Sequence, residues 1–505
     1  MNVTSGRRYA KPLELECDTV VVGSGSGGAP VAATLAEAGE RVIVLEEGPH
    51  VPGPRHGAMR QSESVRHVWR DGAMTLAVGI GDSPSINVTA GRMVGGSSPL
   101  TGGVCFRAPE HVLEEWSSAL SIDDLGPSQM QRWFDQVAKD IHIEDVPASL
   151  RSKSTALFVK GGEALGVKFD SMQRNTHNCN GCGRCNFGCP HEAKLGVDRT
   201  YLPRAARAGA TIVSDAIVER VELEGGRAVG VSGSLLDGEY GAARSALRVR
   251  ARRVVLAAGA MYTPLILRRS GLGRRSGSLG KNLTLHPSFR VMGRFDEPVR
   301  GWEGALQSAY SKHYEHDGTV LNSVFVPNGI LAATMPGFGK HHAKHRALVG
   351  HLAMFGVMIH DEGAGAVWRV PFRREPLLTY KMTKRDRARV PVVLERMAKI
   401  FFAAGAREVF FPVFGLDSVT PDTLGKVDWS KIKGPKLECS SQHPLGTCHM
   451  GSSDAHSVVD PHGRVWDVPN VFVADGSILP TSLGVNPQWT IMAMSLRVAH
   501  SLAGG

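Results

Sequence analysis

Short, almost continuously apolar runs near the start of the chain predict a sheet whose strands are buried on both faces. Residues 18–22 and 41–45 are two such runs, rich in valine and isoleucine and without regular polar alternation. Between them, residues 29–39 are rich in alanine and have the apolar spacing of a helix. Strand, helix and strand in this order are typical of an α/β domain with a parallel sheet.

The middle of the chain has a different pattern. Residues 320–326 and 348–359 contain alternating apolar stretches that predict strands, and residues 391–405 have the apolar spacing of a helix. Residues 205–234 predict a helix end, a strand and a hairpin around residues 224–226. From about residue 288 to 434 no glycine fingerprint occurs, so we expect a second domain there.

Composition is that of an ordinary soluble protein. The 505 residues can form two or more domains, with 42% apolar and 21% charged residues. No run reaches the roughly 18–20 apolar residues of a membrane span. The N-terminus lacks the apolar core of a secretion signal. We therefore expect a cytoplasmic protein with reduced thiols.

The net charge of +10 is modest for this length. Its denser basic segments lack interleaved aromatic residues, which favours solvated surface and argues against nucleic-acid binding. An acidic redox partner or a peripheral contact with an anionic membrane stays open as an alternative.

The first predicted strand leads into a glycine-rich turn before the predicted helix. Gly23 permits the tight turn, Gly25 lets the backbone approach a pyrophosphate, and Gly28 lets helix and strand pack closely. Glu46, at the end of the second strand, can hold a ribose hydroxyl pair. The motif predicts dinucleotide binding and does not by itself distinguish FAD from NAD.

Two later segments favour FAD. Residues 91–98 form a second glycine–serine loop, and residues 253–273 read as a buried strand, a glycine turn and a helix. One mononucleotide-binding half does not need glycine loops so far along the chain. An extended flavin dinucleotide, contacted along its length by separate segments, does.

A run of four cysteines is the most specific chemical signal. Cys179, Cys182, Cys185 and Cys189, followed by proline, have the C-x2-C-x2-C-x3-C-P spacing of bacterial ferredoxins. The glycines between them permit the tight folding that converging thiolates require. We expect these cysteines to bind an iron–sulfur cluster, of the 4Fe-4S or the 3Fe-4S type. Another metal such as zinc, a disulfide and a purely structural turn remain alternatives.

These segments resemble the glucose–methanol–choline (GMC) flavoprotein oxidoreductases, from about residue 18 to residue 499. Residues 259–273 fit the second signature of that family, and residues 91–100 fit the first. The chain departs from the first signature at Thr101, and Cys105 with Phe106 stands where the family has an aromatic residue. The cysteine run resembles most the long-chain alcohol oxidase-like and sterol oxidase-like subgroup.

The resemblance implies an α/β fold with a Rossmann-like FAD-binding domain and an α+β substrate domain built on an antiparallel sheet. The implied ranges are residues 1–287 for the FAD-binding domain, 288–434 for the substrate domain and 435–505 for a return to the FAD-binding domain. The first range contains the cysteine-rich insertion 175–194. FAD is expected to be non-covalent, because the 91–101 loop contains no histidine. The residues implied to bind FAD are Gly23, Gly25, Gly28, Glu46, Arg92, Gly95, Gly96, Ser97, Ala258, Gly259, Asp475, Gly476, Asn486 and Pro487.

His443 matches the catalytic histidine of the family, and Asn486 matches the second catalytic position. A neutral imidazole can take the hydroxyl proton of an alcohol, and an amide can stabilise the developing alkoxide. Asp475 is expected at the start of the last helix, with its flanking N–H groups near the cofactor, or as a plain N-cap. Four further side chains could line an apolar pocket or belong to the core: Met354, Phe355, Met358 and Trp368.

The leading hypothesis is an FAD-dependent dehydrogenase for a small-molecule alcohol, a hydrophobic primary alcohol or a sterol in preference to a sugar, whose electrons leave through the cluster to an unidentified acceptor. One alternative is an oxygen-using alcohol or sterol oxidase with a structural cysteine run. Another is a flavin and iron–sulfur electron-transfer module that oxidises no alcohol. The sequence identifies neither the alcohol nor the oligomeric state.

Overall fold

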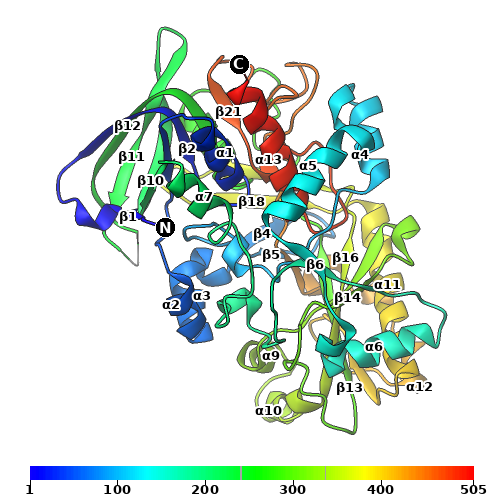
Figure 1. Ribbon diagram of the computed structural model, residues 1–505. Coiled ribbons are helices and arrows are strands. Elements are labelled where there is room, and N and C mark those ends of the chain that lie inside the picture. Colours follow the sequence, from blue (N-terminus) through cyan, green and yellow to red (C-terminus); the bar gives the residue numbers. More distant parts are fainter. Residues whose placement is uncertain (239–240, 336, 505) are drawn as a thin grey trace.

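The computed structural model describes residues 1–238, 241–335 and 337–504, and two large sheets organise this part of the chain (Figure 1). The first sheet, eight strands among the described residues, has the order β1-β9-β3-β2-β12-β11-β10, with β21 also paired to β12. Its strands are β1 (Thr4–Ser5), β9 (Thr211–Ser214), β3 (Val42–Leu45), β2 (Leu13–Val22), β12 (Ala243–Leu256), β11 (Arg227–Leu236), β10 (Ala216–Glu224) and β21 (Val471–Val473).

The central strands of this sheet are parallel, as the buried apolar runs predict. β2 pairs with both β3 and β12 in parallel, and Val20, Val21 and Val44 are fully buried. β10 and β11 form the predicted hairpin, with a turn between Glu224 and Arg227. The predicted α/β class is therefore confirmed.

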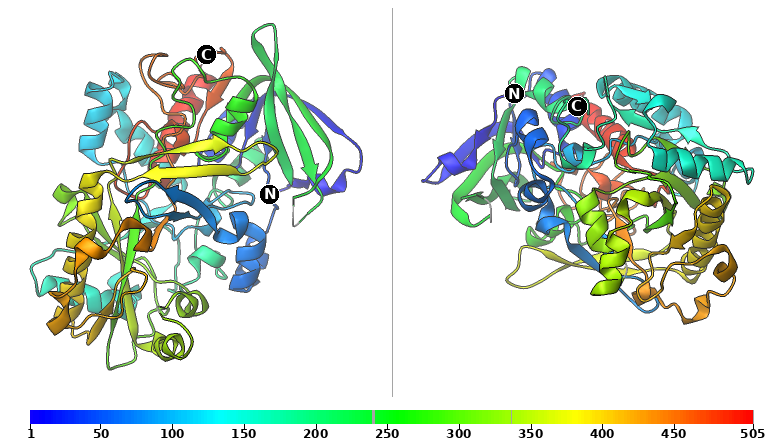
Figure 2. Two further views of the ribbon diagram at one scale, coloured as in Figure 1. Left: turned by 180° about the vertical axis from the view of Figure 1, so that it is seen from behind. Right: turned by 90° about the horizontal axis from the view of Figure 1, so that it is seen from below.

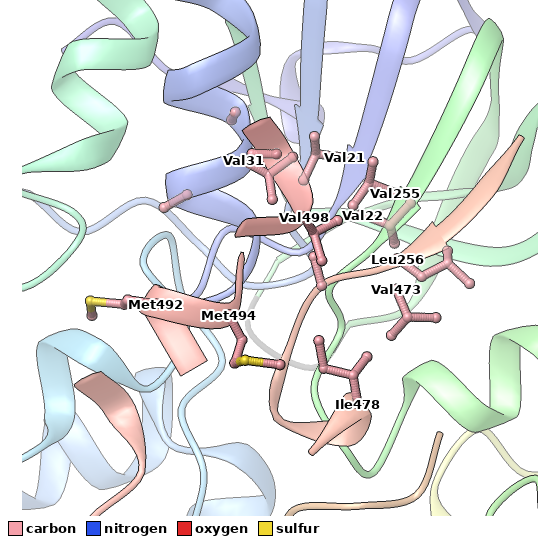
Figure 3. Packing of buried hydrophobic residues seen from close by; sticks show 14 of the residues in the cluster. Val21, Val22, Val31, Val255, Leu256, Val473, Ile478, Met492, Met494 and Val498 are labelled. Atoms are coloured by element: carbon pink, nitrogen blue, oxygen red, sulfur yellow. The ribbon is translucent and has the colours of Figure 1, made fainter. Parts of the chain in front are cut away.

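Two helices from opposite ends of the sequence pack on this sheet. α1 (Gly28–Glu37) follows the glycine turn, and α13 (Gln488–Ala503) packs against it. Figure 3 shows the resulting core, in which Val31 of α1 and Val498 of α13 meet strand residues such as Val255. This core is closed only because β21 and α13 return from the far end of the chain.

The second sheet is mostly antiparallel. Its order is β17-β18-β4-β5-β20-β13-β16-β15-β14-β7, with β19 paired to β13, and its two parallel pairs join β4 to β18 and β5 to β20. The strands are β17 (Ala364–Arg369), β18 (Pro376–Lys381), β4 (Thr75–Gly79), β5 (Ile86–Val88), β20 (Cys439–Ser441), β13 (Ser288–Arg294), β16 (Leu352–Ile359), β15 (Thr319–Ser323), β14 (Ala309–Ser311), β7 (Asp170–Ser171) and β19 (Glu408–Phe410). Segments before residue 288 and after residue 434 thus contribute strands to it.

Helices α6 (Lys153–Glu163) and α11 (Lys384–Ala403) cover the second sheet. The ring of Phe158 on α6 stacks on Phe355 of β16 at 4.0 Å between centroids. α11 begins before the predicted start at residue 391, because Thr383 and Asp386 form a capping box and the helix continues through Pro391. In the two views of Figure 2, the first sheet and this second region lie on different sides of the molecule.

The remaining helices are α2 (Gly53–Ala58), α3 (Gln61–Val68), α4 (Glu110–Ser118), α5 (Pro127–Asp140), α7 (Tyr201–Arg207), α8 (Thr263–Arg269), α9 (Asn328–Thr334), α10 (Lys340–Arg346) and α12 (Pro421–Leu424). A small two-stranded sheet pairs β6 (Ile143–Asp145) with β8 (Gln173–Asn175). None of the helices in the described ranges combines the length and apolarity needed to cross a membrane.

Candidate functional site

One cavity collects most of the residues that the sequence predicts for cofactor binding and catalysis. Segments from both ends of the chain and from the β12–α8 turn line it. Gly28 and Gly95 are not among its lining residues. The predicted residues that do line it are Gly23, Gly25, Glu46, Arg92, Gly96, Ser97, Ala258, Gly259, His443, Asp475, Gly476, Asn486 and Pro487.

Several glycines around the turn leave no space for a side chain. A Cβ on Gly28 would lie 2.0 Å from the carbonyl oxygen of Gly23, which explains the close contact of helix and strand. Across the cavity wall, a Cβ on Gly96 would lie 2.8 Å from the Cα of Gly25. Gly96 also has a φ of 59°, which disfavours other residues. Two backbone loops therefore approach each other at the N-terminus of α1, where N–H groups favour an anionic ligand.

Glu46 is buried and holds the glycine turn together. Its carboxylate accepts hydrogen bonds from the backbone N–H of Ser24 at 3.1 Å, the hydroxyl of Ser24 at 2.6 Å and the N–H of Gly48 at 2.9 Å. Burial raises the pKa of Glu46, and these hydrogen bonds oppose that rise. Glu46 lines the cavity.

Asp475 joins the second glycine segment to the C-terminal segment. Its carboxylate accepts from the N–H of Gly259 at 2.8 Å, the hydroxyl of Thr263 at 2.6 Å and the N–H of Ser477 at 2.7 Å. The prediction that Asp475 starts the last helix is wrong. It caps a short 3-10 helix, Gly476–Ile478, whereas α13 begins at Gln488 after Pro487. The segment between the two contains Asn486.

His443 and Asn486 meet at the cavity wall. The amide Nδ2 of Asn486 lies 3.1 Å from Nε2 of His443, and Nδ1 of His443 is buried without a hydrogen-bond partner. Burial, reinforced by neighbouring His286, lowers the pKa of His443 well below its ordinary value. The imidazole is therefore neutral at physiological pH, and its Nε2 can accept the hydrogen bond from the amide of Asn486.

His286, which the sequence analysis did not select, fixes the loop that carries Asn486. Its Nε2 accepts hydrogen bonds from the N–H groups of Leu483 at 3.0 Å and Gly484 at 3.1 Å, so the ring must be neutral with its proton on Nδ1. Burial lowers the pKa of His286 to about 3. The rings of His286 and His443 lie 5.3 Å apart, edge to face.

Asp361 supports the same loop from the second sheet. Its carboxylate accepts from the hydroxyl of Ser482 at 2.7 Å, the hydroxyl of Tyr380 at 2.7 Å and the N–H of Leu285 at 3.0 Å. Leu285 precedes His286 and Ser482 precedes Leu483, so Asp361 joins the two segments that meet in the contact between His286 and Leu483. Its position in an apparently ordinary turn gives no sequence signal, because its partners lie far away in the chain.

The residues expected at an apolar pocket are elsewhere. Met354, Phe355 and Met358 are buried in the cores around β16, and Trp368 is half exposed on β17. None of the four lines the cavity. Met354, Phe355 and Met358 therefore belong to the core, which was the alternative to pocket lining in the sequence analysis.

The four cysteines of the run line a second, small cavity. Arg174, Lys194 and Ala305 are among the other residues of its wall. Cys189 and Cys182 share a hydrogen bond, and this bond together with backbone N–H groups lowers the pKa of the Cys189 thiol to about 5. These contacts favour the ionised form of the Cys189 thiol.

Two buried cations connect this cavity to the first one. Nε of Arg174 donates to the carbonyl of Gly102 at 2.7 Å, while its NH2 group lies 2.8 Å from the sulfur of Cys185. Nζ of Lys194 donates to the carbonyls of Thr101 at 2.8 Å and Cys185 at 3.2 Å. Gly102 and Thr101 line the first cavity. The two cavities are thus separated by little more than one layer of side chains.

The layer between the two cavities carries two buried cations, Arg174 and Lys194. Arg174 is only 1% exposed, and it has no carboxylate partner within the ranges that the structure describes. An unpaired buried charge costs several kcal/mol. The polar contacts of its guanidinium are the carbonyl of Gly102 and the sulfur of Cys185.

The sulfurs of the run do not converge as closely as the ligands of one metal ion. Zinc–sulfur bonds of about 2.3 Å in a tetrahedron place ligand sulfurs about 3.8 Å apart. Among the described residues, which include all four cysteines, no three of these thiol sulfurs lie within 4.8 Å of one another. Cys182 and Cys189 are in hydrogen-bonding contact.

Comparison with protein families matches two parts of the chain to GMC oxidoreductase models. The N-terminal model matches residues 17–288, and the C-terminal model matches residues 373–495. Together they cover more than half of the chain and all residues of the first cavity except Gln307.

Similar proteins include an uncharacterized GMC-type oxidoreductase, y4nJ, of Sinorhizobium fredii, which is 34% identical over 97% of this chain and 95% of its own length. Long-chain-alcohol oxidase FAO3 of Arabidopsis thaliana is 29% identical over 98% of this chain and 69% of its own. Among solved structures, pyridoxine 4-oxidase from Mesorbium loti superposes with a TM-score of 0.74 at 20% identity, covering 97% of this chain and 99% of that one.

Proposed function

Because the chain belongs to the GMC oxidoreductase family, we propose that it oxidises an alcohol to a carbonyl with FAD, using His443 as the base and Asn486 to hold the hydroxyl. One observation carries this proposal: the 3.1 Å approach of the Asn486 amide to Nε2 of His443 at the wall of the first cavity. An isolated buried histidine would need no such partner facing a cavity.

The residues of the first cavity fit FAD. The converging loops at Gly25 and Gly96 provide backbone N–H groups without side chains, as a pyrophosphate requires. Glu46 would bind the ribose, and the segments around Arg92, Ala258 and Asp475 would hold the rest of the cofactor. Residues 91–104 contain no histidine, cysteine or tyrosine, so we expect non-covalent binding.

FAD supplies the hydride acceptor, and the chain supplies the proton acceptor. A substrate hydroxyl that replaces the hydrogen bond between the two side chains can donate to the lone pair of His443 Nε2 and accept from the amide of Asn486. Because the pKa of His443 is lowered by burial, the imidazole is ready to accept a proton without first losing one. The amide stabilises the developing negative charge without ionising.

We propose a hydrophobic primary alcohol as the substrate. The similarity to long-chain-alcohol oxidases supports this class. Apolar side chains of the cavity, namely Val104, Met261, Leu265, Leu445 and Ile491, provide surface for an aliphatic chain.

For the electrons we propose an exit through an iron–sulfur cluster bound by Cys179, Cys182, Cys185 and Cys189, which would accept them one at a time for an external acceptor. The cysteine spacing and the shared cavity support this proposal. Arg174 and Lys194 would offset the negative charge of the cluster, and they contact the wall of the first cavity. In this form the enzyme is a dehydrogenase.

The second candidate is an oxidase, in which oxygen receives the electrons directly and the cysteine run is structural. Several similar proteins carry oxidase names, which favours this alternative. A pure electron-transfer module is less well supported, because it leaves the contact between His443 and Asn486 without a role.

An absorption spectrum of anaerobically purified protein tests the proposal. A flavin band on broad brown absorbance, with both bleached by a long-chain alcohol, is expected for the dehydrogenase. A pure flavin spectrum that bleaches with alcohol, together with peroxide formation in air, would establish the oxidase. A flavin band that no alcohol bleaches would refute both.

A further inference from the structure

Two histidines and a glutamate meet on the small sheet that leads into the cysteine run. β6 pairs antiparallel with β8, placing Glu144 opposite Arg174. His142 directly precedes β6, Glu144 lies in its middle, and His177 follows β8. The strand pairing therefore brings three potential metal ligands from two segments to one place.

The distances between their ligand atoms match those around a small divalent ion. Nδ1 of His177 lies 3.2 Å from Nε2 of His142, which lies 3.3 Å from Oε2 of Glu144. A tetrahedral zinc ion with bonds of about 2.0–2.1 Å to nitrogen holds its ligand atoms about 3.3–3.4 Å apart. Nowhere else in the described part of the chain do three histidine, cysteine or carboxylate ligand atoms come within 4.8 Å of one another.

Hydrogen bonds alone do not satisfy this arrangement. Nε2 of His142 faces both an imidazole nitrogen and a carboxylate oxygen, and it carries at most one proton. If it is protonated and donates to Glu144, Nδ1 of His177 must share the same proton or remain without a hydrogen bond from His142. If it is unprotonated, its lone pair faces the carboxylate. A cation satisfies all three atoms at once.

The surroundings have the features of a built site. The second oxygen of Glu144 accepts a hydrogen bond from the hydroxyl of buried Thr176 at 2.8 Å, as oxygen ligands of metals commonly do. His142 has a φ of 53°, in the left-handed region that is uncommon outside glycine, and this conformation directs it toward His177. Local strain of this kind persists where the surroundings impose it.

We propose that His142, Glu144 and His177 bind a divalent transition-metal ion, zinc foremost, with water as the fourth ligand. Two imidazoles and one carboxylate are a donor set that suits zinc and its neighbours in the first row. The ion joins β6 to the segment 174–177, which contains Arg174 and leads to Cys179. The ion would anchor the strand that holds Arg174 against Cys185. It does not depend on the proposed redox activity.

Cobalt(II) titration of the full-length protein tests the proposal, because tetrahedral cobalt has visible ligand-field bands. Sulfur ligands add near-ultraviolet charge-transfer absorption, which separates any ion at the cysteine run from an ion at the proposed site. We expect one equivalent with visible bands and no added sulfur absorption, displaced by zinc. The double variant His142→Ala/His177→Ala should lose this equivalent, whereas His191→Ala, an exposed histidine in the same neighbourhood, should keep it.

Thr176→Val tests the site without touching a ligand. Loss of the hydroxyl that orients Glu144 should weaken cobalt binding about 10–100-fold. Zinc should raise the melting temperature of the wild type and of His191→Ala, and leave that of the double variant unchanged. Equal cobalt binding by the wild type and the double variant would overturn the proposal, as would unchanged affinity in Thr176→Val. Neither result would bear on the proposed oxidation of an alcohol with FAD.

Discussion

The contact between His286 and the loop before Asn486 permits a sharp test of how the candidate active site is held. Nε2 of His286 accepts two backbone hydrogen bonds, from Leu483 and Gly484, in a fully buried position. We compare His286→Leu, which removes the acceptor, with His286→Gln, whose side-chain oxygen can take the place of Nε2. Both variants have the same left-handed backbone to adopt, since φ of His286 is 48°, so this strain cancels in the comparison.

The expected difference follows from the two N–H groups. Each buried donor left without a partner costs about 1–3 kcal/mol, so His286→Leu should be about 2–6 kcal/mol less stable than His286→Gln. Because Asn486 follows two residues after Gly484, the leucine variant should also lose alcohol oxidation more strongly. The glutamine variant should retain most of it.

Acid pH provides a second expectation for the same residue. The pKa of His286 is lowered to about 3 in the folded protein, below the value of about 6.5 of an unfolded histidine. Protonation therefore favours the unfolded state, and the stability that neutral His286 provides is complete above pH 6.5 and lost as the pH falls toward 3. The stability advantage of the wild type over His286→Gln should accordingly shrink between pH 6.5 and 4.

Urea unfolding followed by tryptophan fluorescence measures the stabilities, and anaerobic alcohol-driven dye reduction measures the activity. Equal unfolding midpoints for the leucine and glutamine variants would refute the hydrogen-bond argument. A pH-independent difference between wild type and His286→Gln would refute the assignment of a neutral ring.

Further predictions concern the catalytic pair, the cofactor cavity and the cysteine cavity. His443→Ala should lower kcat about 10²–10⁴-fold with flavin absorbance retained, and full turnover in this variant would contradict the proposed base. Because burial lowers the pKa of His443, the kcat/KM of the wild type should fall only on the acid side, well below pH 6.5, and an acid limb centred above pH 7 would contradict this. Gly96→Val should abolish FAD binding, since even a Cβ there would lie 2.8 Å from the Cα of Gly25; the absorbance ratio at 450 and 280 nm measures this, and normal loading would be inconsistent with it. Arg174→Met should reduce iron per chain at unchanged flavin content, whereas unchanged iron would argue that the guanidinium does not stabilise the cluster.

The sequence predicts those parts of the site whose chemistry is local. The glycine turn, Glu46 and the His443 segment are short motifs next to recognisable strands, and they line one cavity in the structure. The sequence does not reveal His286 or Asp361, because the contacts that hold the loop before Asn486, from Ser482 and Leu483, come from more than a hundred residues away. The position of Asp475 was mispredicted for a related reason, since a turn between two helices has no apolar periodicity.

The buried cations are another part of the site that the sequence alone does not reveal. Lys194 and Arg174 read as ordinary charged residues in the sequence, and only the fold places them between the two cavities. Apolar side chains are equally ambiguous: Phe355 suits a pocket as well as a core, and its stacking on Phe158 decides for the core.

The return of the C-terminal segment has a consequence for how the protein is made. β21 pairs with β12, and α13 packs on α1, although hundreds of residues separate them along the chain. While the ribosome is still adding the second sheet, the glycine turn and α1 therefore lack the partners that bury their apolar faces. Contacts of such high sequence separation fold slowly and leave hydrophobic surface exposed. The nascent N-terminal region should need chaperone protection until residues 471–503 have emerged, and a truncation before β21 should aggregate instead of folding as an independent nucleotide-binding domain.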